Sequence, residues 1–163
     1  MYNSKESEQN HAVVYLSGIL GYNVVNCYLG IFLGKGNLKL NKELMLSKRV
    51  WAVVGANQNP EKFGNRIYSR LKEKGYKTYA VNPLYDKVEG DTCYKDLSSL
   101  PEIPEVIDIV VTPKRAKAII TEASKLGIKY IWFQPDTYDQ EILKYANELG
   151  FVYVLDCVLI ALP

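Results

Sequence analysis

Short apolar runs alternate with amphipathic segments from residue 49 to the end of the chain. The runs are rich in Val, Ile and aromatic residues. They are continuous rather than alternating, which is typical of parallel strands buried on both faces. The pattern predicts five strands, at 50–55, 77–81, 106–111, 128–133 and in the run 151–160, which we interpret as the fifth strand and its continuation.

Apolar residues recur at helical spacing in the segments between these runs. Phe63, Ile67 and Leu71 form one such face, which predicts an amphipathic helix. Thr137 and Gln140 have the T-x-x-Q spacing of a capping box, which predicts the start of another helix. A glycine follows each helical segment, where a left-handed residue commonly ends a helix. The predicted helices cover 63–75, 114–127 and 137–150, with a further short helix at 95–100.

Repeated strand–helix units with short connections predict an α/β fold. Because crossovers between parallel strands are right-handed, the units build a doubly wound, Rossmann-like domain. We expect a five-stranded parallel sheet in a three-layer α/β/α arrangement, with the strand order 3-2-1-4-5.

Residues 1–44 differ in composition from this body. The run 13–34 carries no formal charge and is long enough to cross a bilayer. Three interpretations are open: a membrane anchor that leaves the body in the cytoplasm, an extra hairpin or helix packed on the body, or a segment foreign to the domain, with translation starting at Met45. A cleaved signal peptide fits poorly, because the leader has more acidic than basic residues. We therefore divide the chain into an N-terminal extension, 1–44, and a domain, 45–163.

Charge and reactive residues exclude several function classes. The 20 basic and 18 acidic residues nearly balance, so the chain lacks the basic character of a nucleic-acid-binding protein. His11 is the one histidine, and the three cysteines show no C-x-x-C spacing. A structural zinc site, a disulfide-stapled secreted domain and a Ser-His-Asp triad are therefore all disfavoured. We expect a cytoplasmic protein.

Proline directly follows three of the predicted strands, in Asn82-Pro83, Thr112-Pro113 and Gln134-Pro135. Proline fixes φ and offers a flat apolar face. These loops and the loop 55–60 after the first strand lie at the carboxyl ends of parallel strands, where doubly wound sheets bind ligands. The pattern predicts a rigid, partly apolar rim suited to a nucleotide base.

The loop after the first strand, which ends near Pro60, leads into the helix that begins near Phe63. Free N–H groups and the positive end of the helix dipole favour a phosphate there. Gly55 allows a tight turn, Gly64 allows close backbone approach, and Asn57 can donate to a phosphate oxygen. The glycines of this loop do not have the G-x-G-x-x-G spacing, which argues against a dinucleotide as the ligand. The second strand also ends in Asn82, where an NAD site would carry an acid.

These motifs resemble those of a known family. The series V-V-G-A-N-x-N-P-E-K-F-G-N-R, V-N-P, V-x-P, W-F-Q-P and D-C-V is similar to the small, single-domain CoA-binding proteins. It is more distantly similar to the CoA-binding domain of the succinyl-CoA synthetase α subunit. The resemblance runs from Lys48 to about Ile160.

The resemblance implies a role for each matching position. The pyrophosphate would lie on the first loop and the helix start, the adenosine beside the second strand, the adenine beside the third, and the pantetheine beside the fourth. The corresponding residues are Gly55, Ala56, Asn57, Gly64, Asn65 and Arg66 for the pyrophosphate, Asn82 and Pro83 for the adenosine, Val111, Thr112 and Pro113 for the adenine, and Gln134 and Pro135 for the pantetheine.

The chain departs from the family pattern at two positions. Asn57 stands where serine is usual, and Thr112 stands where a basic residue is frequent. Lys87, Lys114 and Arg115 are then candidates for the 3′-phosphate, and each also fits a solvated surface. Cys157 matches a cysteine common in the family, and it fits either a small buried side chain or a reactive thiol.

The sequence therefore predicts a protein that binds coenzyme A or an acyl-CoA without catalysis of its own. An NAD(H)-binding redox-sensing module and an accessory subunit of an acyl-CoA enzyme are the alternatives. We expect no metal and no nucleic acid, and a membrane contact only if 13–34 is an anchor. The sequence leaves open which protein partner, if any, the chain has.

Overall fold

The computed structural model describes residues 38–163 of the protein. The apolar run 13–34 lies outside them, so the three interpretations of that segment stay open. No helix within the described part of the chain is both long and apolar enough to span a membrane.

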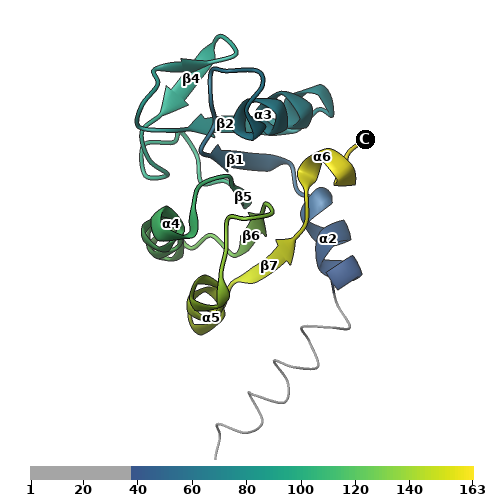
Figure 1. The fold of residues 1–163 in the computed structure, drawn as a ribbon, viewed down its shortest axis with the longest axis vertical. Helices are drawn as coiled ribbons and strands as arrows, with labels where there is room; N and C mark the ends of the chain where they lie inside the picture. The colour runs from purple at the N-terminus through teal and green to yellow at the C-terminus, as the bar shows by residue number, and fades with distance from the viewer. Residues whose placement is uncertain (1–37) are drawn as a thin grey trace, which may run out of the picture. The chain divides into compact units, whose positions relative to one another are not determined.

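A mostly parallel sheet forms the centre of the domain (Figure 1), with the order β3-β4-β2-β1-β5-β6-β7. Each predicted strand is present, which confirms the α/β class. All neighbouring strands pair in parallel except β3 and β4, which form an antiparallel hairpin. The strands are β1 (Val50–Val54), β2 (Lys77–Val81), β3 (Lys87–Val88), β4 (Asp91–Tyr94), β5 (Val106–Ile109), β6 (Tyr130–Phe133) and β7 (Val152–Leu155).

The predicted strand count and strand order were wrong for one reason. The segment 87–94 was interpreted as a loop, but it turns at Glu89 and Gly90, both with positive φ, and returns as β4 beside β2. The five predicted strands consequently lie in the order 2-1-3-4-5. When β4 is counted as the third parallel strand, the parallel strands follow the 3-2-1-4-5-6 order of the doubly wound nucleotide-binding fold.

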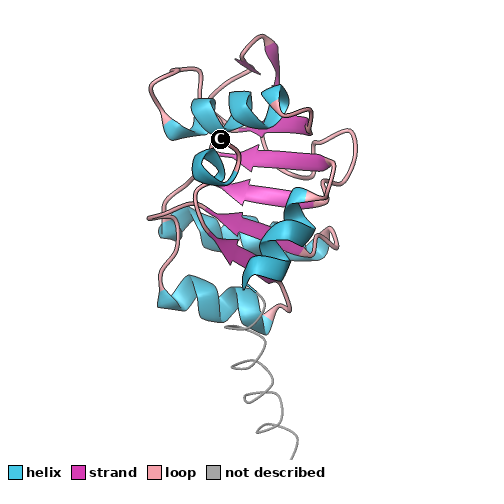
Figure 2. Ribbon diagram, turned by 90° about the vertical axis from the view of Figure 1, so that its right-hand side faces the viewer, coloured by secondary structure: helices cyan, strands magenta, loops and turns pink. Residues whose placement is uncertain are grey.

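Helices cover both faces of the sheet (Figure 2). The three long predicted helices are confirmed as α3 (Phe63–Glu73), α4 (Pro113–Lys125) and α5 (Gln140–Glu148). The capping box was wrong, because Asp139 caps α5 by accepting from the Ile142 N–H at 2.8 Å. Thr137 instead donates to the Gln134 carbonyl oxygen.

Two further expectations need correction. The residues 95–100 form turns rather than a short helix. The run 151–160 does not continue as a strand: β7 ends at Leu155, and α6 (Val158–Ala161) follows. Between β7 and α6, the Asp156 side chain accepts a hydrogen bond from the Cys157 N–H at 2.7 Å. This amide is therefore bonded to a side chain and not to a neighbouring strand.

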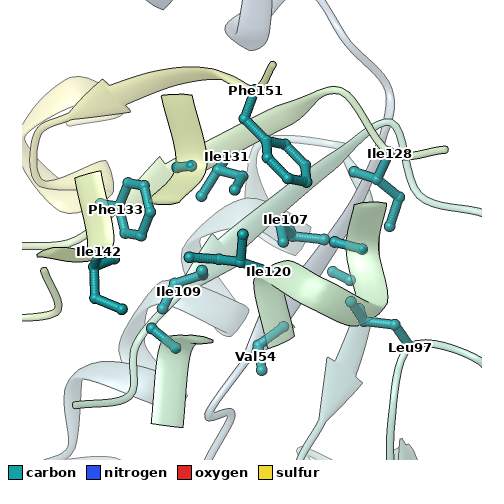
Figure 3. Packing of buried hydrophobic residues seen from close by; sticks show 14 of the residues in the cluster. Val54, Leu97, Ile107, Ile109, Ile120, Ile128, Ile131, Phe133, Ile142 and Phe151 are labelled. Atoms are coloured by element: carbon teal, nitrogen blue, oxygen red, sulfur yellow. The ribbon is translucent and has the colours of Figure 1, made fainter. Parts of the chain in front are cut away.

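Side chains alternate along the strands between two buried clusters. Ala52 and Val54 point to the face covered by α4 and α5, where Ile107, Ile120 and other apolar residues pack together (Figure 3). Trp51 and Val53 point to the opposite face, which is covered by α3 and α6. Burial on both faces explains why the strand sequences are continuously apolar.

The helix α2 (Leu38–Leu46) spans the boundary expected between 44 and 45. Met45 is fully buried in the same cluster as Trp51. Lys42 forms an ion pair with Asp156, at 2.5 Å between Nζ and Oδ2. Residues on both sides of the boundary therefore contact the body, and independent folding from Met45 stays a prediction.

Candidate functional site

A cleft of about 700 Å³ opens at the carboxyl ends of the central strands. This is within the usual size range of cofactor sites. The loops that follow β1, β5, β6 and β7 line it, together with the first turn of α3 and the start of α6. Its lining residues are Gly55, Asn57, Lys62, Phe63, Gly64, Arg66, Val110, Val111, Thr112, Gln134, Pro135, Asp136, Thr137, Cys157, Leu159 and Ile160.

The first turn of α3 is pressed against the end of β1. Gly55 has φ +101°, and a Cβ on Gly64 would lie 2.1 Å from the Gly55 carbonyl oxygen. Gly64 is thus required because two stretches of backbone touch. The close backbone approach expected at Gly64 is thus present, and the backbone that approaches is that of Gly55.

This packing places the start of α3 at the cleft, where some of its backbone N–H groups have no acceptor. Lys62 is the N-cap, and its side chain makes no capping hydrogen bond. The N–H groups of Phe63 and Gly64 donate to no acceptor within residues 38–163. The first turn contains no acidic residue, and Lys62 and Arg66 both line the cleft. Such a helix end is an anion-binding geometry.

Asparagine side chains fix the loop between β1 and α3. Asn57 accepts from the Asn59 N–H at 2.8 Å and donates to the Tyr85 hydroxyl at 3.2 Å. Asn65 is buried and donates to the Asn57 carbonyl oxygen at 2.9 Å. Asn82 donates to the Ala56 carbonyl oxygen at 2.7 Å. Asn65 and Asn82 thus shape the site without lining it.

The remaining predicted residues divide into those that line the cleft and those that do not. Ala56 is fully buried beneath the loop, while Pro60 and Pro83 are exposed outside the cleft, and Pro113 begins α4. The nine predicted residues that line it are Gly55, Asn57, Phe63, Gly64, Arg66, Val111, Thr112, Gln134 and Pro135.

Sequence reasoning missed one wall of the cleft and one of its basic residues. Leu159 and Ile160 were overlooked because the run 151–160 was interpreted as a strand continuation. Lys62 lies directly before the predicted helix start, where the search for N–H donors could have found it. The candidates for the 3′-phosphate, Lys87, Lys114 and Arg115, do not line the cleft. The lining residues absent from the predicted site are Lys62, Val110, Asp136, Thr137, Leu159 and Ile160, and Cys157 was named only for its thiol.

A buried carboxyl group contacts one of the residues that line the cleft. Asp108 is fully buried on β5, and burial raises the pKa of its side chain to about 7, while a hydrogen bond from Gln134 opposes the rise. The Gln134 Nε2 donates to Asp108 Oδ1 at 2.9 Å, and the Gln134 Oε1 accepts the Val158 N–H at 3.3 Å. Gln134 therefore joins Asp108 to the start of α6.

The described residues contain no group of three His, Cys, Asp or Glu side chains that could hold a metal ion. Cys157 is half-buried and lines the cleft, whereas Cys93 is buried, and burial raises the pKa of the Cys93 thiol. The arrangement is therefore that of a binding cleft with one accessible thiol.

A family model described as a CoA binding domain matches residues 49–163. The chain belongs to this CoA-binding domain family. The match begins after α2 and covers every strand and the whole cleft lining. It agrees with the family resemblance drawn from the motifs.

Curated relatives of this CoA-binding domain are archaeal ADP-forming acetate–CoA ligases. The α subunit of ligase II from Pyrococcus furiosus is 35% identical over 79 residues, which cover 48% of this chain and 17% of the relative. Ligase I from Archaeoglobus fulgidus is 31% identical over 118 residues, which cover 66% of this chain and 17% of the relative. The chain thus matches about a sixth of the length of these relatives.

Solved structures of similar size share the fold of this CoA-binding domain. A hypothetical protein from Pyrococcus horikoshii has a TM-score of 0.71 and 35% identity, covering 76% of this chain and 87% of that one. A conserved hypothetical protein from Pyrococcus furiosus has a TM-score of 0.63 and 40% identity, covering 66% of this chain and 92% of that one.

Proposed function

We propose that the cleft binds coenzyme A or an acyl-CoA, with the pyrophosphate on the first turn of α3. The observation that carries the proposal is the pair of unpartnered N–H groups of Phe63 and Gly64, two residues that line the cleft together with Lys62 and Arg66. A helix N-terminus with two adjacent basic side chains suits a pyrophosphate, which brings two negative charges to one place.

The rest of the cleft suits the other parts of this cofactor. Val111 and Thr112 line the cleft in the loop after β5, where the adenine would lie. Leu159 and Ile160 give an apolar wall on which the pantetheine or a short acyl group can lie. Cys157 directly precedes α6 and also lines the cleft. The thiol or thioester end of the cofactor would lie near Cys157.

We further propose that the protein binds its cofactor without catalysing a reaction alone. Residues 38–163, which the structure describes, contain no histidine to act as a base for Cys157. The Asp156 carboxylate beside Cys157 accepts its N–H, and the other described cysteine, Cys93, is buried. A place as accessory subunit of an acyl-CoA enzyme is supported by the relatives, which are much longer ligases.

Thermal shift and calorimetry of the full chain test the proposal. Ligand at 100 times its Kd stabilises a folded protein by about 2.7 kcal/mol, so CoA and acetyl-CoA should raise the Tm, and the ligand that binds more tightly should raise it more at equal concentration. NAD and NADH should do so less, because Asn82 at the end of β2 donates to Ala56 and offers no carboxylate to a ribose. Stabilisation by NADH that equals or exceeds that by CoA would contradict the proposal.

A further inference from the structure

Asp108 occupies a position where its charge is costly. It lies in the middle of the sheet, in register with Val53 on β1 and Trp132 on β6. Its side chain is fully buried, and its Oδ2 is the buried polar side-chain atom in the described residues that has no hydrogen-bond partner. A buried carboxylate with one neutral hydrogen-bond donor is strongly disfavoured compared with the neutral acid. Packing alone would favour an apolar residue here.

A hydrogen bond joins the carboxyl group to a side chain that lines the cleft. Gln134 lines the cleft and donates to Asp108 Oδ1 at 2.9 Å. Its other end accepts from the Val158 N–H at 3.3 Å, and the next two residues of α6, Leu159 and Ile160, form the apolar wall. Asp108 therefore determines which end of the Gln134 amide faces inward, and through it where α6 begins.

We propose that Asp108 is a positioning residue of the cofactor cleft and that an anionic cofactor binds together with a proton on this carboxyl group. The inference rests on the proposed function, because it requires a negatively charged ligand in the cleft. An ionised Asp108 would place a second negative charge beneath that ligand, in an interior that screens charge poorly. Bound anion and buried carboxylate disfavour each other, so binding favours the protonated acid. By linkage, the affinity falls as the pH rises through neutrality.

Charged groups on the neighbouring elements have other partners. On α2, Lys42 pairs with Asp156, the residue that follows β7. On α3, Arg66 lies over the Phe63 ring, and Arg70 binds the Leu162 carbonyl oxygen and Glu73. Burial and the Gln134 hydrogen bond are the causes that set the pKa of Asp108. The remaining titratable side chains that line the cleft are Lys62, Asp136 and Cys157.

Calorimetry of the full chain tests the coupling. The affinity for dephospho-CoA is measured from pH 6 to pH 8.5, since this ligand lacks the monoester phosphate that titrates near pH 6. All proteins carry His11→Gln, so that no histidine titrates in the range. The parent chain should lose at least fivefold in affinity across it and should take up protons on binding near pH 7, seen as a dependence of the heat on the buffer.

The comparison uses two acid-to-amide variants. Asp108→Asn keeps an oxygen that accepts from Gln134 but removes the charge, so its affinity should vary less than twofold with pH. Asp96→Asn, an exposed acid in a distant loop, should keep the parent profile. A parent profile retained in Asp108→Asn would overturn the inference. If that variant fails to fold, absence of proton uptake by the parent overturns it instead.

The same data separate this inference from the proposed function. Absence of dephospho-CoA and CoA binding at every pH would overturn both. Binding that is tight, pH-independent and free of proton uptake would overturn the role of Asp108 alone.

Discussion

The carbonyl oxygen of Gly55 leaves no room for a side chain at Gly64. A Cβ added to Gly64 would lie 2.1 Å from this oxygen. The end of β1 and the first turn of α3 therefore touch through their backbones. This contact brings the free N–H groups of α3 to the edge of the sheet. Fold and proposed ligand site depend on the same contact.

Gly64→Ala should destabilise the domain severely, by about 4 kcal/mol or more, because a backbone oxygen cannot move aside as a flexible side chain can. Gly75→Ala is the matched control: it has φ +84° but nothing within 4 Å of an added Cβ, so strain of about 1 kcal/mol is expected. Urea unfolding followed by circular dichroism measures both. Equal costs would contradict the close contact.

Arg66→Ala and Lys62→Ala should each weaken CoA binding about tenfold, since a hydrogen bond or close contact between charged groups contributes about 1.5 kcal/mol. The loss should shrink at high salt, because the contacts are exposed. Lys74→Ala, beyond the C-terminal end of the same helix, should leave affinity unchanged. Calorimetry with CoA at two salt concentrations measures the affinity of each variant. If Lys74→Ala loses as much affinity as Arg66→Ala and Lys62→Ala, the phosphates bind elsewhere.

Stability should fall as the pH rises toward neutrality, owing to Asp108. Its pKa is raised to about 7 by burial, against about 3.9 in an unfolded chain. Between these values the folded chain holds a proton that the unfolded chain has released, so the free energy of unfolding decreases with pH, at most about 1.4 kcal/mol per unit. Urea unfolding at pH 5, 6 and 7 should show this slope in the parent and not in Asp108→Asn. Parallel slopes in the two proteins would show that Asp108 is ionised while folded.

Acetyl-CoA should protect Cys157 from alkylation by iodoacetamide. Cys157 lines the cleft and is half-buried, while Cys93 is buried and its pKa is raised, so Cys93 should react slowly with or without ligand. Peptide mass spectrometry follows each cysteine separately, and acetyl-CoA has no free thiol to consume the reagent. Unchanged alkylation of Cys157 at saturating acetyl-CoA would place the ligand outside this cleft.

The layered fold could be predicted from the sequence because the central strands are buried on both faces and are therefore mainly apolar, with Asp108 of β5 as an exception. The β3–β4 hairpin could not, since both strands are short and contain polar residues such as Lys87 and Asp91, with β3 at the sheet edge and β4 next to it. An edge strand needs little apolar surface. Its sequence consequently resembles that of a loop.

The candidate site could be predicted in part for a similar reason. Strand-end loops identify the correct edge of the sheet, and Gly55, Gly64 and Gln134 lie there as expected. Whether an asparagine side chain faces the cleft or the backbone beneath it depends on the tertiary contact, as with Asn82 and Ala56. The short helix α6 was not predicted because its apolar sequence directly continues that of β7.

Met45→Ala should lower the free energy of unfolding by about 2–4 kcal/mol, the usual cost of truncating a large buried side chain. Met45 is fully buried in the cluster on Trp51, although it precedes the family match that begins at residue 49. Leu40→Ala is the control on the same helix, since Leu40 is 59% exposed and should change stability by less than about 0.5 kcal/mol. Both substitutions affect helix propensity in the same direction, so the difference between them reports the packing of α2 on the body. Two small and equal effects in urea unfolding would mean that α2 does not pack as described, and a chain that starts at residue 49 would then be as stable as the full one. A large effect at Met45 alone makes α2 part of the folded domain and places the boundary of that domain before residue 45.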